Sequence, residues 1–250
     1  MPHERLKGLP WGDKDNYKKA GIDSALIGWL PTQCGGLKVG PDGSVYLGLR
    51  VLPRDYPLPE AWTKADGYMQ MLGSVIKFKP TGGGVYPDDG RKGTWKNGIE
   101  LPIPEKFGEG LPMGGVRTQH GQSLTKTYFE GAVKSYPGLA PFSGYGRSDG
   151  CVCQTPRFDV DGYGRLYLPN ALTCSVSIVD NAGNQILRFG GYGNHDSAGP
   201  KSAVPAPAIP LAYPVAAQVS FKHIYVADSA NRRVVRVDPR YALEAVCDVK

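Results

Sequence analysis

Two cysteines separated by one residue, Cys151 and Cys153, are the local feature that most directly suggests chemistry in this sequence. They lie just before the first strand of the clearest repeat, where both thiols would point to one side of the chain. With His120 they could bind zinc or copper, because thiolate and imidazole ligands suit these metals. A second ligand pair is missing, however, and small buried cysteines are common. A disulfide to Cys34 or Cys174 is a further alternative.

The other ionisable residues show no catalytic spacing. The four histidines lie at positions 3, 120, 195 and 223 and form no HxH or HExxH motif; His223 is expected in a solvent-exposed turn. Five aspartates stand at predicted strand ends and turns, where carboxylates commonly accept hydrogen bonds from backbone N–H groups. These are Asp159, Asp161, Asp180, Asp228 and Asp238. Calcium binding or catalysis is the alternative role for this group.

Basic residues are densest at Arg232, Arg233 and Arg236, with Arg240 close behind. The net charge of +6 and the pI near 9.0 permit attraction to nucleic acid, anionic polysaccharide or a membrane surface. Elsewhere the basic residues are scattered and often stand beside acids. The arginines are therefore either polyanion contacts or one solvated strand face.

Composition favours many short strands. The 34 glycines and 22 prolines are spread between apolar runs, which is typical of strands joined by turns. Nothing at the N-terminus resembles a signal peptide, and no stretch approaches the ~20 apolar residues of a membrane helix. We therefore expect no membrane insertion, and the compartment stays undecided.

One unit of alternating strands and turns runs from Pro156 to Gly193. Apolar and β-branched runs at 158–160, 166–168, 176–179 and 186–189 predict four antiparallel strands. The turns between them contain Asp, Asn and Gly, which tolerate positive φ. Four strands in about forty residues are typical of one β-propeller blade.

This unit recurs along the chain, and its third strand is marked by Val75, Val133, Val176 and Val234. Residues 36–47 and 73–78 repeat it upstream, and residues 213–238 repeat it downstream. Residues 131–138 match the third-strand pattern and predict a degenerate further copy. We therefore expect about four blades, at approximately 35–86, 87–146, 150–193 and 205–250. Residues 1–34 would lead into the propeller or complete it.

Residues 224–234, Ile-Tyr-Val-Ala-Asp-Ser-Ala-Asn-Arg-Arg-Val, closely resemble the core of the NHL repeat, and residues 156–193 resemble a second copy. The resemblance covers roughly 35–80 and 150–250, with a weaker match at 95–146. It implies an all-β fold, a β-propeller of NHL type. Such propellers commonly have six blades, so four imply an open arc of a longer polypeptide, closure with residues 1–34, or assembly with another copy. An open arc leaves two edges able to pair with other strands.

The resemblance is less specific for function, since NHL-type propellers are protein-interaction scaffolds, RNA binders and amidating-lyase domains. Long insertions at 49–73, 87–130 and 194–212 are of the kind that carries binding contacts. We therefore expect a non-catalytic scaffold whose inserted loops and one disc face bind a protein partner or the remainder of a larger polypeptide. One alternative is a metal-dependent lyase or hydrolase at the central channel, with zinc, copper or calcium. The other is RNA or polyanion binding.

Two shorter elements are also expected. Residues 60–72 predict a short helix after a proline-rich start, with Gly67 as its weak point. Residues 25–30 predict a strand that leads into the first blade.

Overall fold

The computed structural model describes residues 28–29, 34–53, 56, 71–87, 113–116, 124–142, 155–197, 201–203 and 205–239. The described elements are eighteen β-strands and one short 3-10 helix at His195–Ser197, which confirms the all-β class. Of the helix predicted at 60–72, only the last two residues are described. Within the described part, no helix has the length and apolar character needed to cross a membrane.

The first sheet has four antiparallel strands in the order β2-β3-β5-β9. Their bounds are Cys34–Val39, Val45–Leu49, Gly73–Phe78 and Ala132–Leu139. The prediction for residues 131–138 was wrong in one respect. This segment is the fourth strand of the first sheet, paired with β5, and not the third strand of a separate unit.

The second and third sheets follow the predicted strands closely. The second has the order β10-β11-β12-β13, with bounds Asp159–Val160, Leu166–Asn170, Ser175–Val179 and Gln185–Phe189. The third has the order β16-β17-β18, with bounds Pro214–Val219, Ile224–Asp228 and Arg233–Val237. Both are antiparallel, with neighbouring strands joined by short turns.

A five-stranded sheet has the order β1-β6-β8-β7-β4. Its bounds are Gly28–Trp29, Gly83–Pro87, Leu124–Glu130, Met113–Val116 and Val51–Pro53. Two residues of the strand predicted at 25–30, Gly28 and Trp29, form the edge strand β1 of this sheet. This strand pairs in parallel with β6 and not with the first sheet. A two-stranded parallel pair, β14 (Gly191–Tyr192) with β15 (Pro210–Leu211), joins the second sheet to the third. Among the described strands no sheet closes on itself.

The first three sheets share one register. In each sheet the marker valine pairs with the fourth residue of the neighbouring inner strand: Val75 with Gly48, Val176 with Pro169 and Val234 with Ala227. The second residue of that inner strand is a tyrosine in every case, at Tyr46, Tyr167 and Tyr225. Three of the four predicted third-strand markers are therefore structurally equivalent.

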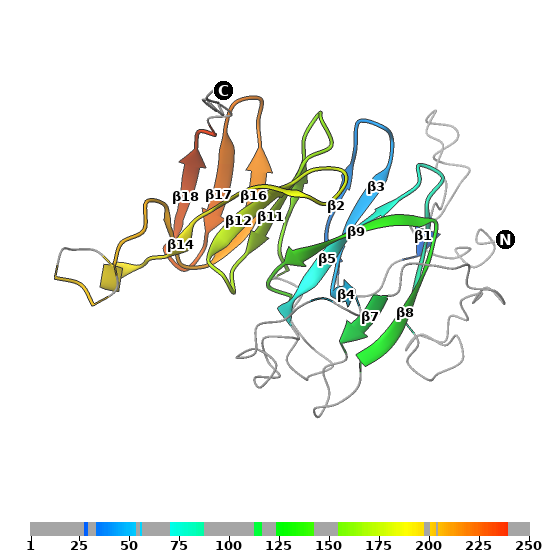
Figure 1. Cartoon of the computed structure of the whole chain (residues 1–250), viewed down its shortest axis with the longest axis horizontal. Coiled ribbons are helices and arrows are strands. Elements are labelled where there is room, and N and C mark those ends of the chain that lie inside the picture. Colours follow the sequence, from blue (N-terminus) through cyan, green and yellow to red (C-terminus); the bar gives the residue numbers. More distant parts are fainter. Residues whose placement is uncertain are drawn as a thin grey trace, which may run out of the picture.

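The sheets lie side by side (Figure 1). Apolar side chains are buried between them. Tyr46, Val75 and Phe158 belong to the cluster between the first and second sheets. Tyr167, Val176 and Ile224 belong to the cluster between the second and third. On its other side the first sheet packs against Phe129 of the five-stranded sheet. The core is thus divided into layers, each shared by two neighbouring sheets.

Polar contacts also join successive sheets. Asn170 Nδ2 donates to the carbonyl oxygen of Gly138 at 3.0 Å, which ties the second sheet to the last strand of the first. The Tyr136 hydroxyl donates to the carbonyl oxygen of Asn181 at 2.9 Å, and burial raises the pKa of Tyr136 to about 12. Arg157 exchanges two backbone hydrogen bonds with β16. The layers are therefore held by directional bonds as well as by packing.

Candidate functional site

The predicted metal ligands Cys151, Cys153 and His120 lie outside the described residues. In the described part of the chain, no group of three His, Cys, Asp or Glu side chains is arranged to hold a metal ion. Cys34 and Cys174 are free thiols, so neither forms the disulfide that the sequence left open. Burial raises the pKa of both thiols, which keeps them protonated near neutral pH.

The predicted polyanion contacts do not form one patch. Arg233 and Arg236 are three positions apart on β18, so their side chains leave opposite faces of the third sheet. Arg233 Nε lies 3.2 Å from the buried carboxylate of Asp228, and Arg236 Nε lies 3.3 Å from Asp238. Arg232 stands in the turn before β18 with a φ of 51°. Two of the three arginines are therefore committed to ion pairs within their own sheet.

Four of the five aspartates do accept backbone N–H bonds, as the sequence suggested. Asp159, Asp161, Asp180 and Asp228 each accept at least one. Asp238 differs, because it contacts the side chains of His223 and Arg236. Their main role is therefore to fix turns and sheet junctions.

A cleft of about 1150 Å³ opens between the β10–β11 hairpin of the second sheet and the β16–β17 hairpin of the third. Both hairpins project from the same end of their sheets, at the top of Figure 1. The lining residues are Val160, Asp161, Gly162, Tyr163, Arg165, Tyr167, Val219, Ser220, Phe221, Lys222, His223 and Pro239. This cleft is the candidate functional site.

One wall of the cleft is the turn that follows β10, and Asp161 organises it. Its carboxylate accepts the amide N–H groups of Tyr163 and Arg165, both at 2.9 Å. The Arg165 Nε atom at 2.6 Å and the Tyr167 hydroxyl at 3.1 Å also donate to it. Burial opposes ionisation of Asp161, but these donors and the Arg165 charge outweigh it and lower the pKa. The ionised carboxylate of Asp161 therefore holds the turn in one conformation.

The hydrogen bonds to Asp161 also place the aromatic ring of Tyr163 at the tip of the turn. Tyr163 is 80% exposed, and the guanidinium carbon of Arg165 lies 5.1 Å from the centre of its ring. This is a cation–π distance, so the arginine supports one side of the ring. A planar ligand group could stack on the exposed surface of Tyr163.

The opposite wall is the β16–β17 turn. The amide of Ser220 donates to the carbonyl oxygen of His223 at 2.8 Å, which closes a tight hairpin. Phe221 at its tip is 99% exposed, and Lys222 beside it is also exposed. His223 closes this turn, and its side chain is 34% exposed. Its Nδ1 atom lies 2.6 Å from Asp238.

The cleft offers aromatic stacking surfaces and positive charge. Exposed aromatic rings stand at the tips of two neighbouring hairpins, with the exposed cation Lys222 beside Phe221 and the Asp161-paired Arg165 beside Tyr163. The Ser220 hydroxyl donates to the His223 carbonyl and not to its ring, so these two residues do not form an activated nucleophile and base. The arrangement suits a ligand with planar groups and negative charge.

The sequence did not point to Tyr163, Phe221 or Lys222. Each stands at the tip of a turn, and the alternation of apolar and polar residues that identifies strands gives no information about turn residues. The available signal was a bulky aromatic residue at the tip of two successive copies of the same hairpin. It becomes a site only because the two hairpins lie side by side.

No protein-family model matches this chain, and no curated protein matches it either.

Proposed function

We propose that this chain is a non-catalytic binding module, an arc of an NHL-type β-propeller, and that the hairpin cleft is where it takes its ligand. Three sheets in one register, each stacked on the next, support the propeller assignment. The observation that carries the function is the pair of exposed rings, Tyr163 and Phe221, on opposite walls of the cleft. Exposed aromatic residues of this kind are typical of interaction surfaces.

The ligand we infer is a protein segment with acidic and aromatic side chains. Lys222 supplies the positive charge, while the rings supply stacking surfaces. Asp161 adds little repulsion, because Arg165 and two amides already satisfy its carboxylate. Each wall is a hairpin whose turn is closed by hydrogen bonds, so binding needs little rearrangement of the backbone.

The test selects peptides from a random phage-displayed library on the immobilised full chain. We expect enriched peptides to be acidic and aromatic, and to bind a Tyr163→Ser/Phe221→Ser double variant at least about tenfold more weakly. Lys222→Glu should weaken the same peptides. A Tyr192→Ser variant is the matched control, because Tyr192 is an exposed tyrosine away from the cleft.

Peptides that bind the double variant and the control equally well would show that the cleft is not the site. A parallel titration with single-stranded RNA tests the nucleic-acid alternative, since phosphate binding weakens steeply with salt. RNA binding that is tight, salt-dependent and lost in Lys222→Glu would replace the protein ligand with a nucleic acid.

A further inference from the structure

The third sheet has one strand fewer than the first two sheets in the described part of the chain. In the first sheet β9 pairs with β5, and in the second β13 pairs with β12, so each has a fourth strand. The third sheet ends at β18, and no described strand pairs with the other edge of β18. β18 lies at one end of the row of sheets (Figure 1). An edge strand of this kind presents backbone N–H and C=O groups that can bind another strand.

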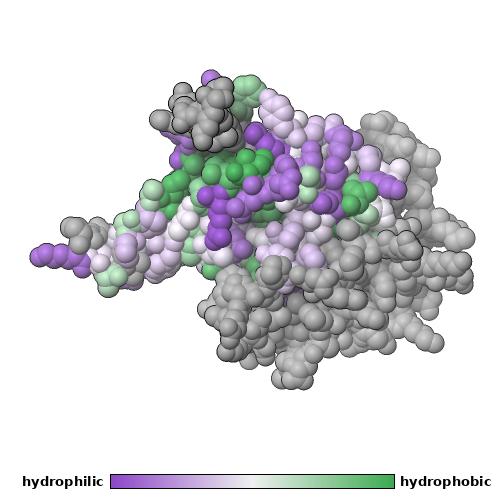
Figure 2. Space-filling view, in the orientation of Figure 1, coloured by the Kyte–Doolittle hydropathy of each residue, from purple (hydrophilic) through white to green (hydrophobic). Residues whose placement is uncertain are grey.

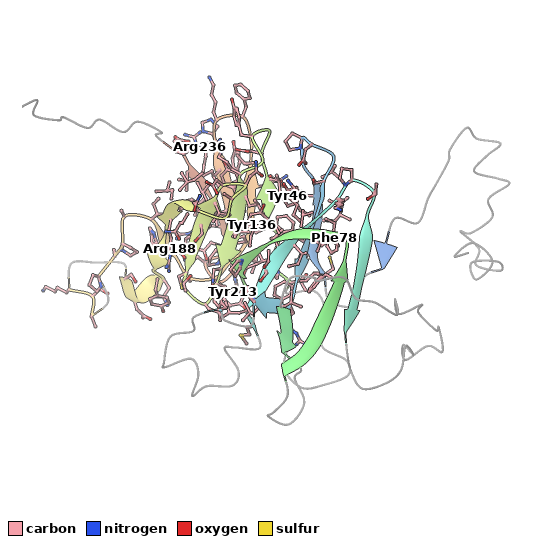
Figure 3. All side chains as sticks on the ribbon, turned by 45° about the vertical axis from the view of Figure 1, so that its right-hand side comes forward. Tyr46, Phe78, Tyr136, Arg188, Tyr213 and Arg236 are labelled. Atoms are coloured by element: carbon pink, nitrogen blue, oxygen red, sulfur yellow. The ribbon has the colours of Figure 1, made fainter. Side chains whose placement is uncertain are left out.

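The edge of β18 is well suited to such pairing. All five of its residues pair with β17 in a single register without a bulge, and none is a proline. Three are valines, which favour strands, and Val234 is 68% exposed. Its two arginines form ion pairs with Asp228 and Asp238 of the same chain. Hydrophobic side chains gather over the third sheet in Figure 2. Figure 3 shows Arg236 of β18 at the outer side of the molecule, whereas Tyr136 of β9 lies among the packed sheets.

The second sheet shows where a fourth strand begins after the third. β12 ends at Val179, and β13 begins at Gln185. Between them, Asp180 and Asn184 close the turn, because each donates its amide N–H to an oxygen of the other. Counted from the marker valines of the two sheets, the corresponding positions after β18 are residues 238–242 and 243–247. Both five-residue segments that precede the fourth-strand positions begin with an aspartate.

We propose that residues 243–247 dock along the free edge of β18 and complete the third sheet as its fourth strand. These residues lie outside the described part of the chain. Their sequence, Leu-Glu-Ala-Val-Cys, has four apolar residues and neither glycine nor proline, while the five residues before it begin with Asp-Pro, a pair typical of turns. A short loop joins the segment to β18, so pairing costs less entropy than binding a strand of a separate chain. This difference favours the chain's own segment over a partner's strand.

The register of the second sheet assigns a specific pair of residues. There the marker valine Val176 pairs with Phe189. The corresponding pair in the third sheet is Val234 with Cys247. Directly opposite residues of an antiparallel pair have Cα atoms about 4.5–5.5 Å apart, which lies within the range of a disulfide. A cysteine at position 234 should therefore reach the native Cys247.

The first experiment introduces Val234→Cys into the full chain and maps disulfides by mass spectrometry after mild oxidation. We expect an intramolecular disulfide between the introduced thiol and Cys247. Val235→Cys is the matched control, because this neighbouring residue points to the opposite face of the sheet. It should link to Cys247 at least about tenfold more slowly.

The second experiment measures the hydrogen exchange of the β18 amides and does not depend on thiols. Ala245→Pro/Val246→Pro removes the N–H groups of two neighbouring residues, so a bond to β18 is lost whichever of the two faces it. We expect the β18 amides to exchange at least about tenfold faster in this variant. Val249→Pro/Lys250→Pro is the matched control, because it lies beyond the proposed strand and should leave the exchange unchanged.

Equal crosslinking of the two cysteine variants overturns the proposal, as does exchange that the proline pair at 245 and 246 leaves unchanged. A disulfide that joins position 234 of one chain to Cys247 of another also overturns it, since the strand would then come from a second copy. β18 does not line the ligand cleft, so peptide binding there is a separate measurement and either proposal can fail alone.

Discussion

Several aspartates of the described structure accept hydrogen bonds within turns. For Asp42, these bonds make the stability of the fold depend on pH in the acid range. Asp42 in the β2–β3 turn lies 2.7 Å from Lys77 Nζ and accepts the amide of Ser44 at 3.0 Å. The hydrogen bond from Lys77, with that from Ser44, lowers the pKa of Asp42 to about 2. The charged form is therefore favoured by folding.

Asp42→Asn should destabilise the protein at neutral pH and not in strong acid. Because the folded pKa is depressed, the stabilisation is fully present above the ordinary value of 3.8 and is lost as pH falls toward 2. The side chain is half-exposed, so the loss at neutral pH should be no more than about 1 kcal/mol. Urea denaturation at several pH values measures it. Lys77→Met should give the same pH dependence, and a loss that persists unchanged at pH 2 would contradict this explanation.

At the level of elements, the β10–β11 hairpin depends on one glycine. Gly164 has a φ of +75°, in the left-handed region that favours glycine. A Cβ atom there would lie 2.6 Å from the side-chain oxygen of Asn181. The same turn carries Asp161 and Tyr163, so its shape determines one wall of the cleft.

Gly164→Ala should lower the free energy of unfolding by about 1–3 kcal/mol, because alanine is strained at this φ and crowds Asn181. Gly162→Ala, two residues earlier, meets no atom within 4 Å and should change stability by less than about 0.5 kcal/mol. Thermal unfolding of the two variants compares them directly. Equal losses would mean that backbone conformation does not limit this turn.

The positions of the strands were largely predictable from the sequence, whereas the pairing between strands was less predictable. The four strands between Pro156 and Gly193 and the three strands between Pro214 and Val237 match their sequence patterns, since alternation and turn residues are local signals. The strand at 132–139 looked like another third strand because it carries the same small and β-branched residues. A local pattern does not record which strand will be the neighbour, and here the neighbour is β5.

Across the whole molecule, equivalent tyrosines in the first and third sheets differ in burial, and we therefore expect them to differ in their contribution to stability. Tyr46 is fully buried between two sheets, whereas the equivalent Tyr225 lies on the outer face. The all-β class could be predicted from composition and turns. The cleft could not, because it depends on two hairpins from different sheets meeting side by side.

Tyr46→Ala should cost about 3–5 kcal/mol, since it leaves a cavity between packed sheets. Tyr225→Ala should cost less than about 1 kcal/mol, because its side chain is 38% exposed and its removal leaves no cavity between packed sheets. Chemical denaturation of both variants at low protein concentration is the measurement. A large loss for Tyr225→Ala under these conditions would mean that its face is covered within the single chain.

Asp159 contacts a lysine of the first sheet and an amide of the third while it belongs to the second. Stacked units usually open one after another, each with its own rate. The Asp159 carboxylate bonds the second sheet to both the first and the third. Neither neighbouring sheet can therefore separate from the second without breaking one of these bonds. We expect the amide protons of β2, β10 and β16 to exchange with solvent at a common rate, as if they belonged to one strand.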